Sequence, residues 1–510
     1  MNAESQSLWM EQPLPPLATT GGRPDAAQVC VIGAGIAGVS IALRLAEAGR
    51  QVLLIDRDGL GAGETARTSA HLASALDDRY YRLEHWHGKD GAALAAQSHA
   101  AAVDLIEEWS RRYAIDCDFE RIPGYLLPAP GADVQELERE YEAALRAGLD
   151  VTRLEAGLAA LPAWGPVLRF AGQARFHPLK YLLGLYTAAL AAGVRFMRAE
   201  AGDVEDGEQP RVLLADGGLI QAESVVVASN VPFHRRVALH TKQAAYRSYM
   251  LAGLIPAGRM PDALIWDTAD PYRYLRLQPA GDGKDWLLIG GCDHKTGQAP
   301  ARDPLEELRE WAGEYCKELE NIQYAWSGQI IEPVDGLAFI GRDPGARNVY
   351  VVSGDSGNGL THATLAAPLI TALIVDGEHP WAALYDPARK RLTGDWLEEN
   401  ANVALQYRDW LAAGDSNDVA ALPPGQGAVI RHGLHRFALY RNEDGSLSAL
   451  SARCPHLGCA VRWNALERSW DCPCHGSRFA AADGHVLNGP ARSGLEPLAG
   501  ERIDGVSSAA

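Results

Sequence analysis

Near the N-terminus, apolar and polar positions follow a pattern typical of a buried sheet covered by a helix. Val29–Ile32 is a short apolar run, and the glycine-rich segment Gly33–Gly38 follows it directly. An alanine- and leucine-rich stretch then continues to Gly49, and a second apolar run ends at Asp56. Short apolar runs on either side of a helix-length segment are typical of parallel strands buried on both faces. The pattern therefore predicts a strand–helix–strand unit and an α/β fold.

Later segments predict further helices and half-buried strands. Val134–Leu145 and Trp396–Leu411 have helical apolar spacing. In the second of these, the apolar positions are Leu397, Ala401, Ala404 and Leu411. Aromatic and β-branched residues predict sheet strands at Tyr246–Leu251, Tyr272–Leu277 and Trp286–Ile289. Asp415–Gln426 has the glycine, proline and aspartate content of a linker, and a predicted hairpin, Phe437–Leu450, follows it.

The N-terminal glycines stand in the order G-x-G-x-x-G between a predicted strand and a predicted helix. Gly33 permits the tight turn, Gly35 lets the backbone approach a pyrophosphate, and Gly38 allows the helix to pack closely on the strand. The helix N-terminus favours an anion, and Asp56 is placed to accept from ribose hydroxyls. The segment predicts a dinucleotide-binding site, and this fingerprint alone fits FAD and NAD equally.

Two short boxes near the C-terminus combine cysteine with histidine. The first runs from Cys454 to Cys459 with the sequence CPHLGC, and the second runs from Cys472 to Ser477 with the sequence CPCHGS. Each supplies a thiolate and an imidazole, which is the ligand set of a Rieske 2Fe–2S cluster, where two cysteines hold one iron and two histidines the other. A structural zinc site is the alternative, because paired cysteine and histidine also suit zinc. The boxes predict a centre that moves electrons one at a time.

The boxes resemble those of the Rieske proteins of cytochrome bc and b6f complexes. The cluster ligands that this resemblance implies are Cys454, His456, Cys472 and His475. It also implies a disulfide between Cys459 and Cys474, and a hydrogen bond from Ser477 to a cluster sulfur. Phe479 stands where these proteins usually carry a tyrosine that bonds a ligand sulfur, so we expect a lower reduction potential. The segment Gly489-Pro490-Ala491 resembles the proline loop that covers the cluster.

Three other segments resemble the D-amino acid oxidase and glycine oxidase family of FAD-dependent oxidoreductases. They are Gly61–His71, Ser224–Asn230 and the glycine-rich turn Gly354–Thr361. The resemblance covers about Ser7 to Pro387, and the start of the chain is similar to gamma-glutamylputrescine oxidase-like proteins. It implies that the dinucleotide is FAD.

The same resemblance implies which residues contact FAD. They are Gly33, Gly35, Ile36, Gly38, Asp56, Arg57, Thr65, Ala201, Gly354, Asn358, Gly359, Leu360 and Thr361. Some relatives attach FAD to a cysteine that precedes the last motif. No cysteine lies between Glu318 and Cys454 in this chain, so we expect non-covalent FAD.

Four residues are candidates for contact with the substrate. His71 falls close to where the family meets the isoalloxazine ring, and the alternative is a polar loop histidine without a chemical role. Arg247, Tyr249 and Tyr274 lie on predicted strands that would roof the flavin, where arginine and tyrosine could clamp a carboxylate. The alternative is ordinary sheet-face side chains. The family needs no obligate side-chain base, so none is assigned.

These motifs define the expected organisation of the chain. The predicted fold class is α/β, with a Rossmann-like FAD domain of the glutathione-reductase type, an α+β substrate domain and a small all-β Rieske domain. The FAD domain is expected at 1–118, 168–238 and 333–392, and the substrate domain at 119–167 and 239–332. A helix and linker at 393–426 precede the Rieske domain at 427–510. We expect the 396–411 helix to pack the tail onto the flavin domain.

Composition narrows the classes of partner and the cellular location. The formal net charge of −18 argues against nucleic acid as a partner. No apolar run reaches the length of a membrane span, and the N-terminal segment lacks the apolar core of a secretory signal. We therefore expect a cytoplasmic protein with no membrane span, in which the Cys459–Cys474 disulfide would be an exception to the reducing environment.

Together, the motifs predict an FAD-dependent dehydrogenase. A C–N bond of a small amine or amino acid would be oxidised, and the electrons would pass from FAD to the cluster and on to a quinone, cytochrome or ferredoxin. One alternative is an NAD(P)H-dependent reductase that supplies a partner oxygenase, although a second G-x-G-x-x-G for the nicotinamide is not found. The other alternative is a non-catalytic redox sensor.

Overall fold

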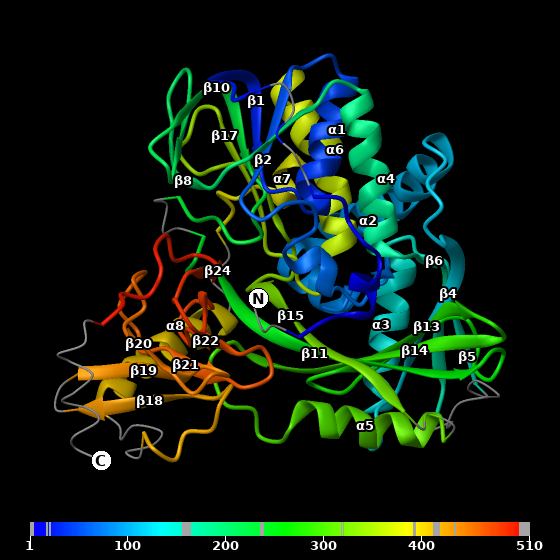
Figure 1. Cartoon of the computed structure of the whole chain (residues 1–510). Helices are drawn as coiled ribbons and strands as arrows, with labels where there is room; N and C mark the ends of the chain where they lie inside the picture. Colours follow the sequence, from blue (N-terminus) through cyan, green and yellow to red (C-terminus); the bar gives the residue numbers. More distant parts are fainter. Residues whose placement is uncertain are drawn as a thin grey trace.

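The computed structural model contains two large sheets, with a smaller β-rich unit beside them (Figure 1). It describes residues 5–498, apart from residues 17–18, 20–21, 156–164, 235–238, 318, 320, 391–393, 412–418 and 433–434. The first four residues of the predicted linker, 415–418, therefore lie outside the described residues.

The first sheet is built on the predicted strand–helix–strand unit. In spatial order its strands are β16 (Phe339–Arg342), β17 (Val349–Ser353), β10 (Leu219–Val227), β1 (Ala26–Ile32), β2 (Val52–Asp56) and β7 (Arg195–Arg198). A small extension adds β8 (Ala201–Glu205) and β9 (Arg211–Leu214). The strands from β17 to β7 are parallel, so their carboxyl ends meet at one edge. Ligands of open α/β sheets bind at this edge.

Helices cover one face of this sheet and bury the apolar side chains on that face (Figure 1). They are α1 (Ile36–Glu47), α2 (Tyr80–Arg112, kinked at Gly88), α4 (Pro178–Ala191), α6 (Gly359–Val375) and α7 (Ala382–Tyr385). α1 packs against α6 and α4. The short turns η1 (Leu8–Glu11) and η2 (Glu64–Arg67) lie beside α4.

The second sheet is larger and mostly antiparallel. Its strands run in the order β15 (Ile322–Pro333), β11 (Gln243–Pro256), β14 (Lys284–Lys295), β13 (Arg273–Gly281), β12 (Leu264–Asp267), β4 (Glu120–Leu127), β6 (Val167–Arg175) and β3 (His71–Leu72), and β5 (Val151–Leu154) pairs with β6. α3 (Val134–Arg146) packs on β5 and β6, and α5 (Pro304–Tyr315) packs on β11 and β14. Asp303 caps α5 by accepting from the amides of Leu305 and Glu306.

The predicted helix at 134–145 is α3, and the predicted strands fall within β11, β13 and β14. One predicted boundary is wrong. Residues from 168 onward were assigned to the FAD domain, but β6 pairs with β4 and β5 in the second sheet up to Arg175. The apolar side chains of Leu168 and Phe170 gave no indication of which sheet would bury them.

The C-terminal unit consists of two small antiparallel sheets, as predicted for an all-β domain. One contains β18 (Gly427–His432), β19 (His435–Arg441) and β20 (Leu447–Ser451), and the other contains β21 (Arg462–Asn464), β22 (Ser469–Asp471), β23 (Arg478–Ala480) and β24 (Val486–Asn488). Trp470 and Phe479 are fully buried between the strands of its core. In Figure 1 this unit is orange to red and lies beside β11 and β15.

The segment 396–411 is α8 (Gly394–Gln406) followed by the turn η3 (Tyr407–Leu411), but its packing differs from the expectation. The side chain of Glu399 pairs with Lys295 of the second sheet, and Trp410 donates to the carbonyl of Gly458 in the first cysteine box. The helix therefore lies between the second sheet and the C-terminal unit, not on the flavin domain. Its predicted apolar face is the outer one, with Leu397 66% exposed.

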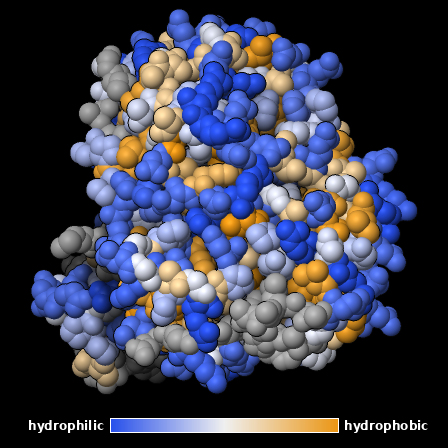
Figure 2. Space-filling model, turned by 90° about the vertical axis from the view of Figure 1, so that its right-hand side faces the viewer, coloured by the Kyte–Doolittle hydropathy of each residue, from blue (hydrophilic) through white to orange (hydrophobic). Residues whose placement is uncertain are grey.

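Within the described part of the chain, no helix is long and apolar enough to cross a membrane. The face in Figure 2 carries mainly hydrophilic side chains, with hydrophobic ones scattered among them.

Candidate functional site

A cavity of about 370 Å³ lies between the carboxyl edge of the first sheet and the face of the second sheet. The ends of β1, β2, β10 and β17 contribute its floor, and β11, β13 and β15 contribute its roof. A third wall comes from the C-terminal unit, through Leu487, Asn488, Gly489, Ala491 and Arg492. All three parts of the chain therefore meet around one cavity.

The turn after β1 has the geometry of a phosphate-binding loop. Gly33 has φ +112°, and a Cβ there would lie 2.4 Å from the carbonyl oxygen of Ala228. The amide of Ala34 donates to Asp56 Oδ2 at 2.8 Å, and the amide of Ile36 donates to Thr65 Oγ1 at 3.1 Å. These contacts hold the turn and the start of α1 open toward the cavity. A pyrophosphate fits such a helix N-terminus.

Most of the predicted FAD contacts line this cavity. They are Gly33, Gly35, Ile36, Asp56, Arg57, Thr65, Ala201, Gly354, Asn358, Gly359 and Leu360. Gly38 and Thr361 are not among the lining residues. A Cβ at Gly38 would lie 1.8 Å from the carbonyl oxygen of Gly33, so this glycine serves close packing, and Thr361 is buried behind the cavity against His99.

The second glycine-rich turn, after β17, faces the other end of the cavity. Asp355 Oδ1 accepts from the amide of Ile331 at 2.7 Å and ties the turn to β15. Burial raises the pKa of Asp355 to about 7. α6 begins at Gly359, so its amide-rich end also points to the cavity. The N-termini of α1 and α6, together with the Asp56 carboxylate that is placed to face a ribose, fit an elongated dinucleotide such as FAD.

Replacing Gly33 with alanine is expected to weaken FAD binding by about tenfold or more, because a left-handed residue and a backbone clash together cost at least ~1.4 kcal/mol. The visible absorbance that the purified variant retains after dialysis measures this loss. Gly313→Ala in α5 is the matched control, because a Cβ there meets nothing within 4 Å. Full flavin retention in the Gly33 variant would contradict the assignment of this turn.

The roof end of the cavity carries aromatic and acidic side chains. Tyr272 donates to Asp77 Oδ2 at 2.7 Å, and the ring of Tyr274 lies 5.1 Å from that of His71, edge to face. Burial, together with the charge of Arg276, lowers the pKa of His71 to about 3, so its ring is neutral near pH 7. His71 and Tyr274 both line this end of the cavity. The sequence pattern gave no indication of Asp77, which is one of two adjacent aspartates after the flavin loop.

The other two candidates, Arg247 and Tyr249, do not line the cavity. Their neighbours Ser248 and Met250 do, because successive side chains of a strand point to opposite faces. Tyr249 stacks on His294, with ring centroids 5.5 Å apart. Arg247 is fully buried on the far face of β11, where it meets the C-terminal unit. Neither residue can clamp a substrate in this cavity.

Arg247 belongs instead to a buried ionic cluster between the parts of the chain. Its centre is Glu467, which lies 3.2 Å from Arg247, 3.0 Å from Arg67 and 4.0 Å from Arg478. Glu467 also accepts from the amide of Ser327 at 3.0 Å. Burial alone would raise the pKa of Glu467, but the three guanidinium groups and the Ser327 hydroxyl lower it to about 2. A buried charge of this kind needs all of its partners.

The two cysteine boxes lie side by side in the C-terminal unit. Hydrogen bonds from Cys472, the backbone of His456 and the Ser477 hydroxyl lower the pKa of Cys454 against the effect of burial. The rings of His456 and His475 lie 4.9 Å apart. The Nδ1 atoms of both rings are buried and have no hydrogen-bond partner. The sulfurs of Cys454 and Cys472 and the unpartnered Nδ1 atoms of His456 and His475 together provide the four ligand atoms that a Rieske cluster needs.

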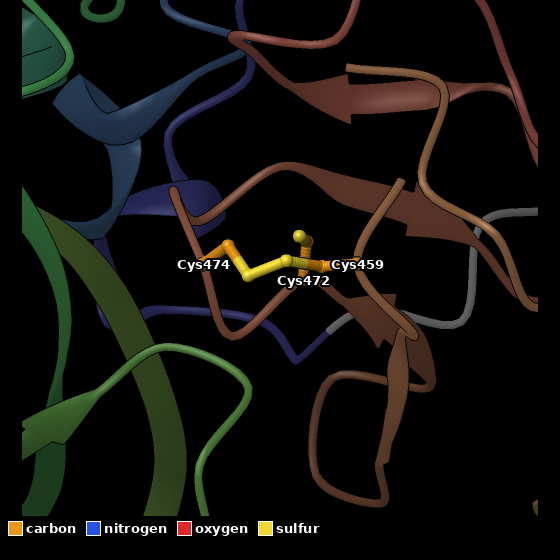
Figure 3. Close-up of side chains that lie close together, drawn as sticks. All are labelled: Cys459, Cys472 and Cys474. Carbon is orange, nitrogen blue, oxygen red and sulfur yellow. A yellow bond between two sulfur atoms is a disulfide. The ribbon is translucent and has the colours of Figure 1, made fainter. Parts of the chain in front are cut away.

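Cys459 and Cys474 form a disulfide that ties the two boxes together, as the sequence comparison with Rieske proteins implied. Figure 3 shows this bond with the sulfur of Cys472 beside it. The three sulfurs lie within 4.8 Å of one another, but two of them are bonded to each other, so the trio is not a three-thiolate metal site.

The imidazole rings of His456 and His475 are partly covered by the rest of the chain. His456 and His475 are half-buried, and the ring of His240 lies 5.2 Å from that of His456, edge to face. His240 itself is buried. In the docked arrangement, His240 therefore covers part of the ring edge of His456 from the side of the second sheet.

The chain matches two family models. "FAD dependent oxidoreductase" (DAO) matches residues 28–373, and "Rieske [2Fe-2S] domain" matches residues 409–499. The chain therefore belongs to the DAO family of FAD-dependent oxidoreductases and carries a C-terminal Rieske domain. Its cofactors are FAD and a 2Fe–2S cluster, and the predicted enzyme class and fold class are confirmed.

Some similar proteins match nearly the whole chain, and others match only its FAD-dependent oxidoreductase part. The Bacillus subtilis protein YhfW, named as a Rieske 2Fe-2S iron-sulfur protein, is 30% identical and covers 92% of each chain. Gamma-glutamylputrescine oxidoreductase of Escherichia coli is 28% identical over 68% of this chain and 83% of its own. The crystal structure of glycine oxidase from Geobacillus kaustophilus, at 21% identity, matches with a TM-score of 0.61 over 72% of this chain and 100% of that one. This last likeness concerns the fold.

Proposed function

We propose that this enzyme oxidises a C–N bond of a small amine or amino acid and delivers the electrons through its Rieske cluster to an external one-electron acceptor. The observation that carries the proposal is the shared wall of the cavity. The loop from Leu487 to Arg492 lines the FAD cavity and also contacts the second cysteine box through Ser477. This shared wall supports a route for electrons from FAD to the cluster within one chain.

Two contacts connect this wall to the candidate ligands. The amide of Ala491, a lining residue, donates to Ser477 Oγ at 3.0 Å, and the Ser477 hydroxyl in turn donates to Cys454. Gln329, also a lining residue, donates through Nε2 to the carbonyl of Gly476 at 2.7 Å. A Cβ at Gly476 would lie 2.2 Å from Ala245 Cβ, so this glycine lets the second box approach β11. The position of the Rieske domain against β11 supports direct electron transfer from the flavin to the cluster, without a rotation of the domain.

The chain's own residues prepare the roof end for amine oxidation. When bound, FAD supplies a hydride acceptor and the cluster supplies a one-electron carrier. The ring of His71 and the hydroxyl of Tyr274 are both uncharged near pH 7. They therefore place no positive charge beside the nitrogen of a bound amine.

The relatives support the substrate class and the acceptor in separate ways. Gamma-glutamylputrescine oxidoreductase and glycine oxidase are named for amine and amino-acid substrates. The cytochrome b6-f complex iron-sulfur subunit of Synechococcus is 40% identical over 95 residues. We infer by analogy that a quinone, a cytochrome or a ferredoxin accepts the electrons here.

Anaerobic reduction of the holoenzyme tests the proposal. Amines or amino acids are expected to bleach the flavin bands, and the Rieske EPR signal should then rise in the same sample, because the cluster is paramagnetic when reduced. NADH and NADPH serve as the parallel arm. Rapid bleaching by a nicotinamide alone would overturn the proposal in favour of a reductase that supplies a partner oxygenase. A flavin that no small molecule reduces would indicate a redox sensor.

A further inference from the structure

The charges around the cavity are distributed unevenly. Among the described lining residues, the cationic side chains are Arg57, Arg67 and Arg492. Arg57 pairs with Asp58 at 2.8 Å, and Arg492 pairs with Asp203 at 2.9 Å, both at the ribose-facing end. Arg67 pairs with Glu467 of the Rieske domain. The guanidinium groups of the lining are thus already paired with carboxylates of the chain.

The roof end, where the substrate would lie, carries carboxylates instead. Asp77 lines it and accepts from Tyr272 through Oδ2. Asp355 lines it from the turn after β17. Behind these, Glu332 shares the hydroxyl of Ser356 with Asp78. Two further guanidinium groups near this end are not among the lining residues: that of Arg79 donates to the carbonyl oxygens of Asp77 and Asp267, and that of Arg276 donates to the carbonyl oxygen of Ser69.

Aromatic rings complete the same end. Tyr272 and Tyr274 lie with ring centroids 5.7 Å apart, and Trp266 lines the cavity beside them. Electron-rich ring faces attract cations, as a carboxylate does. A substrate carboxylate would enter a site that offers it acidic and aromatic neighbours, without a free guanidinium among the described lining residues. Repulsion between a substrate carboxylate and the carboxylates of the site would weaken the binding of such a substrate, and the site therefore selects against it.

We propose that the substrate is an amine with a second, positively charged nitrogen, a diamine or polyamine without a carboxylate, whose distal ammonium is bound by Asp77 between the rings of Tyr272 and Tyr274. This proposal rests on the function proposed above and narrows its substrate class. The reacting nitrogen must be neutral to release a hydride from its neighbouring carbon, so the remaining ammonium provides the charge that the site recognises. The hydride carries both electrons from the carbon to the flavin, and the iminium ion left behind releases one proton from its nitrogen to solvent.

A matched pair of probes tests the class with the wild-type holoenzyme. 1,4-Diaminobutane and 4-aminobutanoate have the same length and differ by an ammonium in place of a carboxylate. Anaerobic flavin bleaching is expected to have a kcat/KM about 100-fold higher for the diamine. Equal or faster bleaching by 4-aminobutanoate, glycine or proline would overturn this inference while the general proposal of amine oxidation survives. Absence of bleaching by every amine and amino acid would overturn both.

Asp77→Asn tests the binding residue, because the amide keeps the shape and still accepts from Tyr272. The KM for 1,4-diaminobutane should rise about 100-fold more than the KM for butylamine, which has no second ammonium. The visible flavin spectrum checks that the variant folds and holds FAD. Glu310→Gln, an exposed carboxylate of α5 that pairs with Arg302, is the control. An unchanged KM in a flavin-loaded Asp77→Asn variant would contradict the proposal.

Discussion

The Cys472→Ser variant is expected to lack the iron–sulfur cluster while keeping its flavin. Cys472 is one of two buried sulfurs in contact at the centre of the boxes, and a serine oxygen is a poor substitute for a thiolate that holds iron. The Rieske EPR signal and its visible absorbance should disappear. Bleaching of the flavin by substrate should continue, because the cavity residues are untouched.

Turnover with a one-electron acceptor should then fall by about 100-fold or more, as expected when a redox centre is removed from a chain of carriers. Cys117→Ala is the control, because this buried thiol lies outside both boxes, beside Ser110. Retention of the EPR signal in Cys472→Ser would contradict the ligand assignment. Unchanged acceptor turnover without a cluster would contradict the proposed electron route.

The Glu467→Ala variant is expected to lose about 3–5 kcal/mol of stability, because it leaves three buried guanidinium groups without their shared carboxylate. The loss should loosen the contact between the Rieske domain and the second sheet. Denaturant unfolding measures the first effect, and the rate at which substrate reduces the cluster measures the second. Glu443→Ala removes an exposed ion pair with Arg468 in the same domain and should cost no more than about 1 kcal/mol.

The pKa of Glu467 also predicts a pH dependence. Its folded value of about 2 lies below the ordinary value of 4.5, so its contribution to stability is complete above about pH 4.5. The contribution is lost progressively as the pH falls toward 2, where the folded carboxylate gains its proton. The stability difference between wild type and Glu467→Gln should therefore shrink on acidification across this range. A difference that stays constant would argue against ionised Glu467 as the source.

Short motifs were the part of the site that sequence could predict. Gly33, Asp56 and the cysteine boxes carry their chemistry within a few residues, and the cavity and the paired boxes contain them where expected. The prediction that Arg247 and Tyr249 contact the substrate was wrong for a geometric reason. A strand exposes alternate side chains to alternate faces, and a shift of one position reverses the assignment. β11 has a bulge between these two residues, which no periodicity in the sequence indicates.

Contacts between residues far apart in the chain could not be predicted from the sequence. Glu467 meets Arg67 across 400 positions, and Arg57 meets Leu487 across 430. No local pattern distinguishes a glutamate that will be buried among arginines from a solvated one. The same holds for α8, whose apolar positions predicted an inner face. The polar side chains of Glu399 and Asn402 make its inward contacts instead.

The loop that walls the flavin cavity is synthesised after all the strands that shape the rest of the cavity. The strands that shape the rest of the cavity end at Ser353, and the wall comes from Leu487 to Arg492. More than a hundred residues therefore separate the synthesis of these strands from the synthesis of this wall. The lining of the cavity is complete only once Arg492 has been synthesised and the Rieske domain has docked.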